Sequence, residues 1–248
     1  MPDITSNLVG HWRCQDNAAS TAVVATVGAQ GTLTNAGNTS ASVTTGPTAT
    51  LTSALLFDGT DDYINFGNVN NLAPNQAFTL AAWLKPSGTS PAAAQFLLSK
   101  QNTVGFGGWY FYRDGTAAGD PYKFGVFVSP QQVEISSPCT NTTAWRHVAI
   151  VNTGTGAASG FTIYEDAVAL TRTVVADTWT NLDPTNAVNM QASGRNGANA
   201  VFPGAVADIR VYARALAQAD ISVLAGLSGF SQPLGRKSRR NLARRMWG

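Results

Sequence analysis

Short stretches of β-branched and aromatic residues recur about every ten to fifteen positions between residues 8 and 212. Residues typical of turns, namely Gly, Pro, Asn and Asp, separate these stretches. The pattern predicts about ten or more short strands, and therefore an all-β domain. The clearest predicted strands are residues 54–57, 63–66, 78–84, 96–98, 109–112, 122–128, 145–151 and 161–164.

Three segments depart from this pattern. Residues 18–53 contain few large apolar side chains and predict a long connection with one or two weak strands. Residues 215–227 predict one short helix, because apolar residues recur there at helical spacing: Leu216, Ile221, Leu224 and Leu227. The last segment is strongly basic, so we divide the chain into a domain of residues 1–230 and a C-terminal arm of residues 231–248.

Composition excludes several classes of protein. Only 12% of residues are charged, against roughly 25% in an average soluble protein, while 44% are hydrophobic, which excludes a disordered chain or a coiled coil. The apolar runs, such as residues 78–84, fall short of the roughly 18 residues that cross a bilayer. The first 25 residues contain no secretory signal pattern. We therefore expect a protein made in the cytosol, without a membrane span.

The arm concentrates positive charge. Six basic residues lie within residues 236–245, which contain no acid, so residues 1–235 carry a net charge of −4 within the total of +2. Two apolar residues four positions apart would form a small stripe on a helix within this basic surface. We expect the arm to bind a protein partner in an assembly. Binding to nucleic-acid phosphates and a solvated tail that only aids solubility are the alternatives. The predicted anchoring residues are Arg236, Lys237, Arg239, Arg240, Leu242, Arg244, Arg245, Met246 and Trp247.

Six motifs in order resemble the laminin-G-like branch of the concanavalin A-like jelly rolls. They are LVGHW at residues 8–12, LFDGTDDYI at 56–64, FTLAAWLKP at 78–86, WRHVA at 145–149, IYED at 163–166 and FPGAVADIRVYARAL at 202–216. The sequence departs from the family at Ala167, where the family has Gly.

The resemblance implies two antiparallel sheets packed face to face, with the terminal strands side by side. It also implies ligand sites on rim loops or on a concave face. We expect both facing layers of such a sandwich to come from Phe57, Trp83, Phe124, Val148, Ile163, Ile209 and Val211.

Catalytic patterns are missing from the sequence. Glycosidases need two carboxyl groups that converge on one sugar, but the two glutamates, Glu134 and Glu165, lie 31 residues apart outside any E-x-D-x-E motif. No G-x-S-x-G turn is present, and we expect His11 and His147, each beside a tryptophan, to be packed within the sheets. The sequence therefore predicts a protein that is not an enzyme.

Two groups of residues are candidates for ligand binding. The family often holds calcium at a rim, and Asp58, Asp61 and Asp62 form a local carboxylate cluster, although ordinary turn chemistry at Asp58-Gly59 also explains it. Glycan binding needs exposed aromatic faces, and strand alternation should bury about half of the candidates. These aromatic candidates are Trp109, Tyr110, Tyr112 and Trp179.

Three functions are consistent with these observations. The first is a non-catalytic display or adhesion module, fixed by its arm to a larger assembly such as a virion, as a phage capsid decoration or tail-associated protein, with a cell-surface glycan as a further partner. The second is a free carbohydrate-binding lectin. The third is a carbohydrate-active enzyme with an unrecognised site.

Deletion of residues 236–248 tests the anchoring role of the arm. We expect the truncated protein to fold with an unchanged melting transition and to lose incorporation into its assembly. Leu242→Ala with Met246→Ala should weaken attachment at every salt concentration, because apolar burial is not screened. Changing the six basic residues to Gln should instead weaken attachment in a salt-sensitive way. Normal assembly of the truncated protein would favour the lectin hypothesis.

Overall fold

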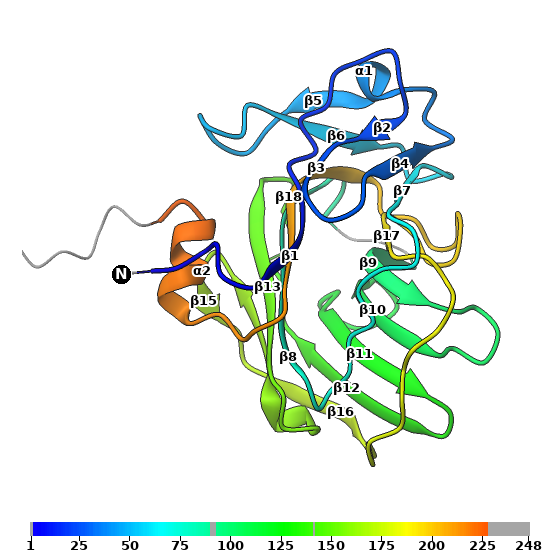
Figure 1. Ribbon diagram of the computed structural model, residues 1–248, viewed down its shortest axis with the longest axis vertical. Coiled ribbons are helices and arrows are strands. Elements are labelled where there is room, and N and C mark those ends of the chain that lie inside the picture. The colour runs from blue at the N-terminus through cyan, green and yellow to red at the C-terminus, as the bar shows by residue number, and fades with distance from the viewer. Residues whose placement is uncertain (1, 90–92, 141, 228–248) are drawn as a thin grey trace, which may run out of the picture.

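The computed structural model describes residues 2–89, 93–140 and 142–227. Figure 1 shows two layers of strands, with a short helix and the N-terminal segment against one of them. The arm and all of its predicted anchoring residues lie outside the described residues, so their role stays a prediction. Within the described residues, no helix is long and apolar enough to cross a membrane.

The first layer, sheet A, contains both terminal strands. The path order of sheet A is β15 (Val168–Ala169), β14 (Phe161–Glu165), β13 (Arg146–Thr153), β8 (Ala77–Pro86), β18 (Gly204–Tyr212), β1 (Leu8–Trp12) and β3 (Ala25–Val27), and off this path lie β6 (Ser53–Phe57) and β5 (Val43–Thr45). The terminal strands β1 and β18 lie side by side, as the family resemblance implied, and β18 also pairs with β8 and β6.

The second layer, sheet B, is also antiparallel. Its order is β16 (Thr173–Asp177), β12 (Gln131–Ser137), β11 (Tyr122–Val128), β10 (Gly108–Asp114), β9 (Ala94–Gln101), β17 (Gln191–Ala192), β7 (Tyr63–Asn65), β4 (Gly31–Thr34) and β2 (Ala22–Val23). The remaining described elements are the helices α1 (Thr39–Ser42) and α2 (Gln218–Leu224) and the short 3-10 turn η1 (Ala158–Gly160). Residues 18–53 thus hold more structure than the sequence predicted, namely β2 to β5 and α1.

Aromatic side chains fill the space between the two sheets. Phe78 from sheet A lies 5.9 Å from Phe124 of sheet B and 6.0 Å from Phe161, measured between ring centroids. Burying each such ring contributes about 1.5 to 3 kcal/mol. All seven predicted core residues are buried, with at most 8% of any one exposed.

Trp83 corrects one part of that prediction, because it does not belong to the facing layers. It packs on the outer face of sheet A in a separate cluster with Leu51, Ala54, Ala205 and Ala207. Strand β8 is covered on both faces, so seven consecutive residues from Phe78 to Leu84 are buried and the polar alternation that marks an outer face is missing. The sequence therefore could not show which side of the strand Trp83 occupies.

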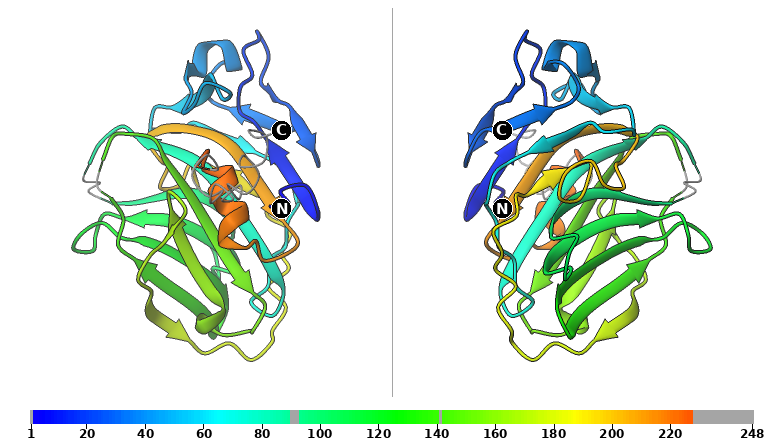
Figure 2. Two further views of the ribbon diagram at one scale, coloured as in Figure 1. Left: turned by 90° about the vertical axis from the view of Figure 1, so that its left-hand side faces the viewer. Right: turned by 90° about the vertical axis from the view of Figure 1, so that its right-hand side faces the viewer.

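Helix α2 covers another part of the outer face of sheet A, as the left view of Figure 2 shows. Ile221 and Leu224 pack there against Ala81 and Val151. Leu227, predicted to lie on the same apolar stripe, is 50% exposed because the helix ends at Leu224.

Trp83→Ala should lower the free energy of unfolding by about 3 to 5 kcal/mol, because the outer-face cluster cannot close around the lost indole. Urea denaturation measures this loss. Leu56→Ala is the matched control, since Leu56 is exposed on neighbouring β6 and its removal should change stability little. A loss of less than about 1 kcal/mol in Trp83→Ala would contradict the buried position.

Candidate functional site

Strand β10 separates the aromatic candidates into two groups. Trp109 and Phe111 point into the core between the sheets, whereas Tyr110, Tyr112 and Asp114 alternate with them and face outward. Trp109 is 1% exposed, and its indole N–H donates to the carbonyl of Asn70 at 2.8 Å. Trp109 is therefore a core residue, and the prediction that it contacts a ligand is wrong.

Trp179 is also a core residue. It is 9% exposed and belongs to the same cluster between the sheets. The polar residues around Trp179 in the sequence predicted an exposed ring. Polar residues can, however, flank a buried tryptophan in the sequence without exposing its side chain. Of the four aromatic candidates, Tyr110 and Tyr112 remain, and both line one pocket.

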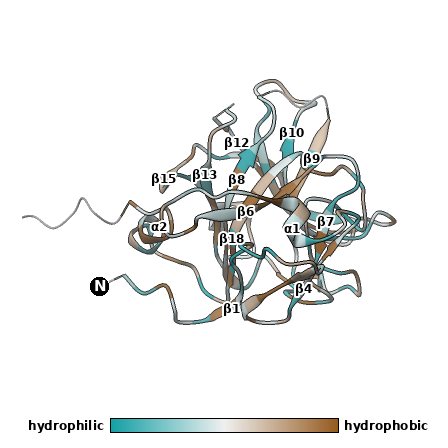
Figure 3. Ribbon diagram, turned by 90° about the horizontal axis from the view of Figure 1, so that it is seen from above, coloured by the Kyte–Doolittle hydropathy of each residue, from teal (hydrophilic) through white to brown (hydrophobic). Residues whose placement is uncertain are grey.

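That pocket lies on the outer face of sheet B, and we call it the outer-face pocket. It is an open hollow of about 390 Å³. In Figure 3 hydrophilic residues mark β10 and β12 among more apolar strands. Aromatic, amide and charged side chains all contribute to its walls: Phe96, Phe106, Tyr110, Tyr112, Phe127, Gln101, Gln132, Asp114, Thr116 and Arg195, with Ala94 and Ala200.

Two tyrosines are fixed in different ways in this pocket. Tyr112 is half-buried and stacks on Phe96, with ring centroids 5.0 Å apart and an interplanar angle of 16°. Tyr110 lies across Gly125 of β11, where an added Cβ would come within 2.5 Å of the tyrosine hydroxyl oxygen. Gly125 is therefore required for the position of the Tyr110 ring.

Polar groups hold the Tyr110 hydroxyl in place. It donates to Glu134 Oε2 at 2.5 Å and accepts from Gln132 Nε2 at 2.7 Å. Burial raises the pKa of Tyr110 far above its ordinary value, and the neighbouring Glu134 charge raises it further. Tyr110 is consequently a neutral hydrogen-bonding group, not a base.

A lysine joins two carboxylates beside these tyrosines. Lys123 Nζ lies 2.8 Å from Asp114 Oδ2 and 3.7 Å from Glu134 Oε1. Partial burial opposes ionisation of Asp114, but hydrogen bonds from Lys123 and Thr116 outweigh it and hold the pKa of Asp114 below its usual value. Sequence reasoning missed this group, although its three members all occupy outward positions on adjacent strands.

The other glutamate is separated from this group. Glu165 accepts a hydrogen bond from the hydroxyl of Tyr122 at 3.0 Å, and Tyr122 belongs to the core between the sheets. Glu134 instead bonds to Tyr110 on the outward side of sheet B. The two glutamates thus lie on opposite sides of sheet B.

The histidines are held within sheet A. His11 Nε2 lies 2.7 Å from Asp208 Oδ1, and Arg210 also bonds to Asp208. This cluster lines a second hollow, of about 450 Å³, on the outer face of sheet A. His147 is buried against Trp83, and burial lowers its pKa to about 4, so it is neutral near pH 7.

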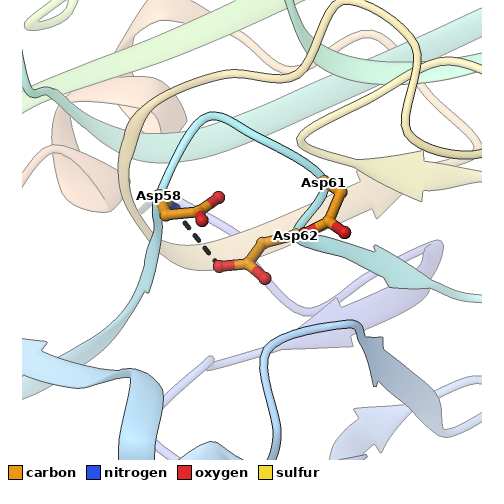
Figure 4. A group of neighbouring side chains, drawn as sticks. All are labelled: Asp58, Asp61 and Asp62. Atoms are coloured by element: carbon orange, nitrogen blue, oxygen red, sulfur yellow. Dashed lines mark hydrogen bonds between the residues drawn. The ribbon is translucent and has the colours of Figure 1, made fainter.

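The three predicted metal ligands do come together in the turn between β6 and β7 (Figure 4). One oxygen from each of Asp58, Asp61 and Asp62 lies within 4.8 Å of the others. Turn hydrogen bonds use two of them: Thr60 N donates to Asp58 at 2.7 Å, and Asp58 N donates to Asp62 at 3.2 Å. Burial raises the pKa of Asp62, and the charges of Asp58 and Asp61 add to the effect. This oxygen-rich cluster could hold a calcium ion.

Calcium should raise the melting temperature if it binds this cluster, because a ligand that binds only the folded state stabilises it. We expect Asp61→Asn to remove the increase while leaving the turn hydrogen bonds of Asp58 and Asp62 intact. Asp183→Asn, at an exposed aspartate elsewhere, is the control. A melting temperature unaffected by millimolar calcium would leave turn chemistry as the full explanation.

Comparison with solved structures finds the same fold in other proteins. A sialidase from Trypanosoma rangeli matches with a TM-score of 0.61 and 17% identity, over 89% of this chain and 32% of the sialidase. The binding domain of Paraclostridial Mosquitocidal Protein 1 matches with a TM-score of 0.62 and 12% identity, over 90% of this chain and 52% of that one. This chain therefore spans about a third of the sialidase and about half of the binding-domain chain.

Another solved structure matches over nearly all of its own length. Domain 4 of AbnA, an extracellular arabinanase from Geobacillus stearothermophilus, was solved in complex with arabinotriose. It matches with a TM-score of 0.58 and 17% identity, over 88% of this chain and 98% of that domain. No curated protein sequence gives a significant match.

The sequence itself identifies the family. Residues 58–222 match the family described as the concanavalin A-like lectin/glucanases superfamily. That segment includes β7 to β18, and thus most of both sheets and the whole outer-face pocket. The chain belongs to the concanavalin A-like lectin/glucanase superfamily.

Proposed function

We propose that this protein is a non-catalytic carbohydrate-binding module that binds saccharide in the outer-face pocket. The observation that supports this most directly is the half-buried Tyr112 ring at an open hollow, with amide, hydroxyl and charged groups around it. Such a combination offers an apolar surface for the face of a sugar and polar groups for its hydroxyls. The arabinanase domain in complex with arabinotriose supports the same use of this fold.

The charged groups at and beside the pocket favour binding over hydrolysis. A retaining or inverting glycosidase needs one carboxyl group with a raised pKa as the acid and a second carboxylate free to act on the sugar or on water. Here Lys123 bridges Asp114 and Glu134, and the pKa of Asp114 is lowered. A product ladder from a β-glucan or alginate, lost in Glu134→Gln, would overturn the non-catalytic role.

We further propose that the module is displayed on a larger assembly, such as a virion, through its basic arm. The separation of charge between the domain and residues 236–245 supports this role. A free lectin is the alternative, and it predicts full glycan binding by an isolated monomer without the arm. The two proposals share the same pocket and differ in how the protein is attached.

Tyr112→Ala should weaken saccharide binding by about tenfold or more, since it removes the ring on which a sugar would lie. Calorimetry with oligosaccharides identified on a glycan array measures the affinity. Tyr164→Ala is the matched control, because Tyr164 is also half-buried but lies on β14 of the opposite sheet. Equal affinities of wild type and Tyr112→Ala, with both proteins folded, would move the binding site elsewhere.

A further inference from the structure

Arg195 occupies one wall of the outer-face pocket in a way that its sequence position does not suggest. It follows β17 in the loop of residues 193–200, where its backbone N–H donates to the carbonyl of Asn199 at 3.0 Å. Its guanidinium carbon lies 4.7 Å from the ring centroid of Phe96 and 5.7 Å from that of Phe106. Two aromatic rings therefore hold the side chain at the pocket.

The described residues provide little polar compensation for this cation. Arg195 Nη1 makes one long hydrogen bond, 3.4 Å, to Gln101 Oε1, and its Nε is buried without a hydrogen-bond partner. No ion pair involves Arg195 within the described part of the chain. Desolvation lowers its pKa, which shows that its charge is held at a cost.

Several other arginines among the described residues form ion pairs with acids. Arg146 lies 2.6 Å from Asp166, Arg210 lies 3.0 Å from Asp208, and Arg214 lies 3.3 Å from Asp220.

The acids on the same face as Arg195 are already engaged. Asp114 bonds to Lys123 and Thr116, and Glu134 bonds to Tyr110 and Gln132. Arg195 thus presents a guanidinium to the pocket with no carboxylate to meet it among the described residues.

We propose that the outer-face pocket selects an acidic saccharide, whose anionic group forms an ion pair with Arg195. Phe96 links the two parts of this site, because its ring stacks on Tyr112 at 5.0 Å and lies against Arg195 at 4.7 Å. A sugar lying on Tyr112 would therefore have an anionic substituent within reach of the guanidinium. The planar fork of arginine binds a carboxylate through two parallel N–H···O bonds, and it binds a sulfate ester through similar bonds. This inference rests on the proposed function and specifies its ligand class.

The test is an array of oligosaccharides in matched acidic and neutral pairs, followed by calorimetry of the pairs that bind. Suitable pairs are 3′-sialyllactose with lactose, trigalacturonic acid with its methyl ester, and lactose 3′-sulfate with lactose. The full chain should bind at least one acidic member about tenfold to a hundredfold more tightly than its neutral partner, as expected for a charge-assisted contact. The pair that shows the preference distinguishes a carboxylate from a sulfate.

Arg195→Gln should remove this preference, because it should weaken binding of the acidic member about tenfold or more relative to the neutral member, whereas Tyr112→Ala should weaken both members by similar factors. If Arg195→Gln lowers the melting temperature of the protein, Arg195→Met is used in its place, because the methionine keeps an apolar side chain against Phe96. Arg13→Gln, at an exposed arginine on the outer face of sheet A, is the control for net charge.

Three outcomes would contradict the inference. Equal affinity of wild type for acidic and neutral members, or a preference that persists in both Arg195 variants, overturns acidic selection and leaves the proposed function standing. Binding to no member of the array overturns both.

Discussion

The alternation of side chains along β10, β11 and β12 is the constraint on which the outer-face pocket depends. In a strand successive side chains point to opposite faces, so the register that buries Trp109 and Phe111 also turns Tyr110 and Tyr112 outward. A slip of one residue would exchange the two sets and put a tyrosine hydroxyl in the core. The large apolar area of the inward set therefore fixes the outward set, and with it the site.

The two sheets differ in what covers their outer faces, and this difference explains where an open aromatic surface can persist. On sheet A, helix α2 and the cluster around Leu51 bury parts of the outer face, so Trp83 and Tyr212 are sealed there. On sheet B the rings of Tyr112 and Phe127 stay half-buried at a hollow. Aromatic rings at an open hollow therefore persist on sheet B, whereas the large rings on the outer face of sheet A are mostly covered.

The sequence predicted the architecture better than the site, and β10 shows why. The spacing of apolar stretches was sufficient to predict the strands and agreed with the two-sheet family. Turn residues and β-branched residues favour their structures locally, so their effect can be read from short segments. The segment Trp-Tyr-Phe-Tyr at 109–112 is aromatic at every position, so no polar residue marks the outward side. Trp109 and Tyr112 were therefore equivalent candidates until the register placed one inside and one outside.

The remaining site residues could not be assembled from sequence for a different reason. Asp114, Lys123, Glu134 and Arg195 come from three strands and a loop, and each is an ordinary polar residue in its own segment. Strand pairing places Tyr112 opposite Lys123 and Gly125 opposite Glu134. This pairing brings Asp114, Lys123 and Glu134 to one face of sheet B. The predicted face of Trp83 was wrong for the same reason, because its strand is buried on both faces and the sequence does not show the register.

The charged residues of the site differ in whether an opposite charge already compensates them. Lys123 pairs with Asp114 and Glu134, and Glu134 bonds to Tyr110, so the pocket residues Asp114 and Tyr110 are held in position without a ligand. Preorganised groups lower the entropy cost of binding, but charges already paired gain little from a saccharide. Arg195 is the opposite case, because its partial desolvation has occurred before any ligand arrives and its counter-charge has not been supplied from the described residues. An anionic ligand would therefore gain most at Arg195, and a neutral sugar would depend mainly on Tyr112 and the polar groups that line the pocket.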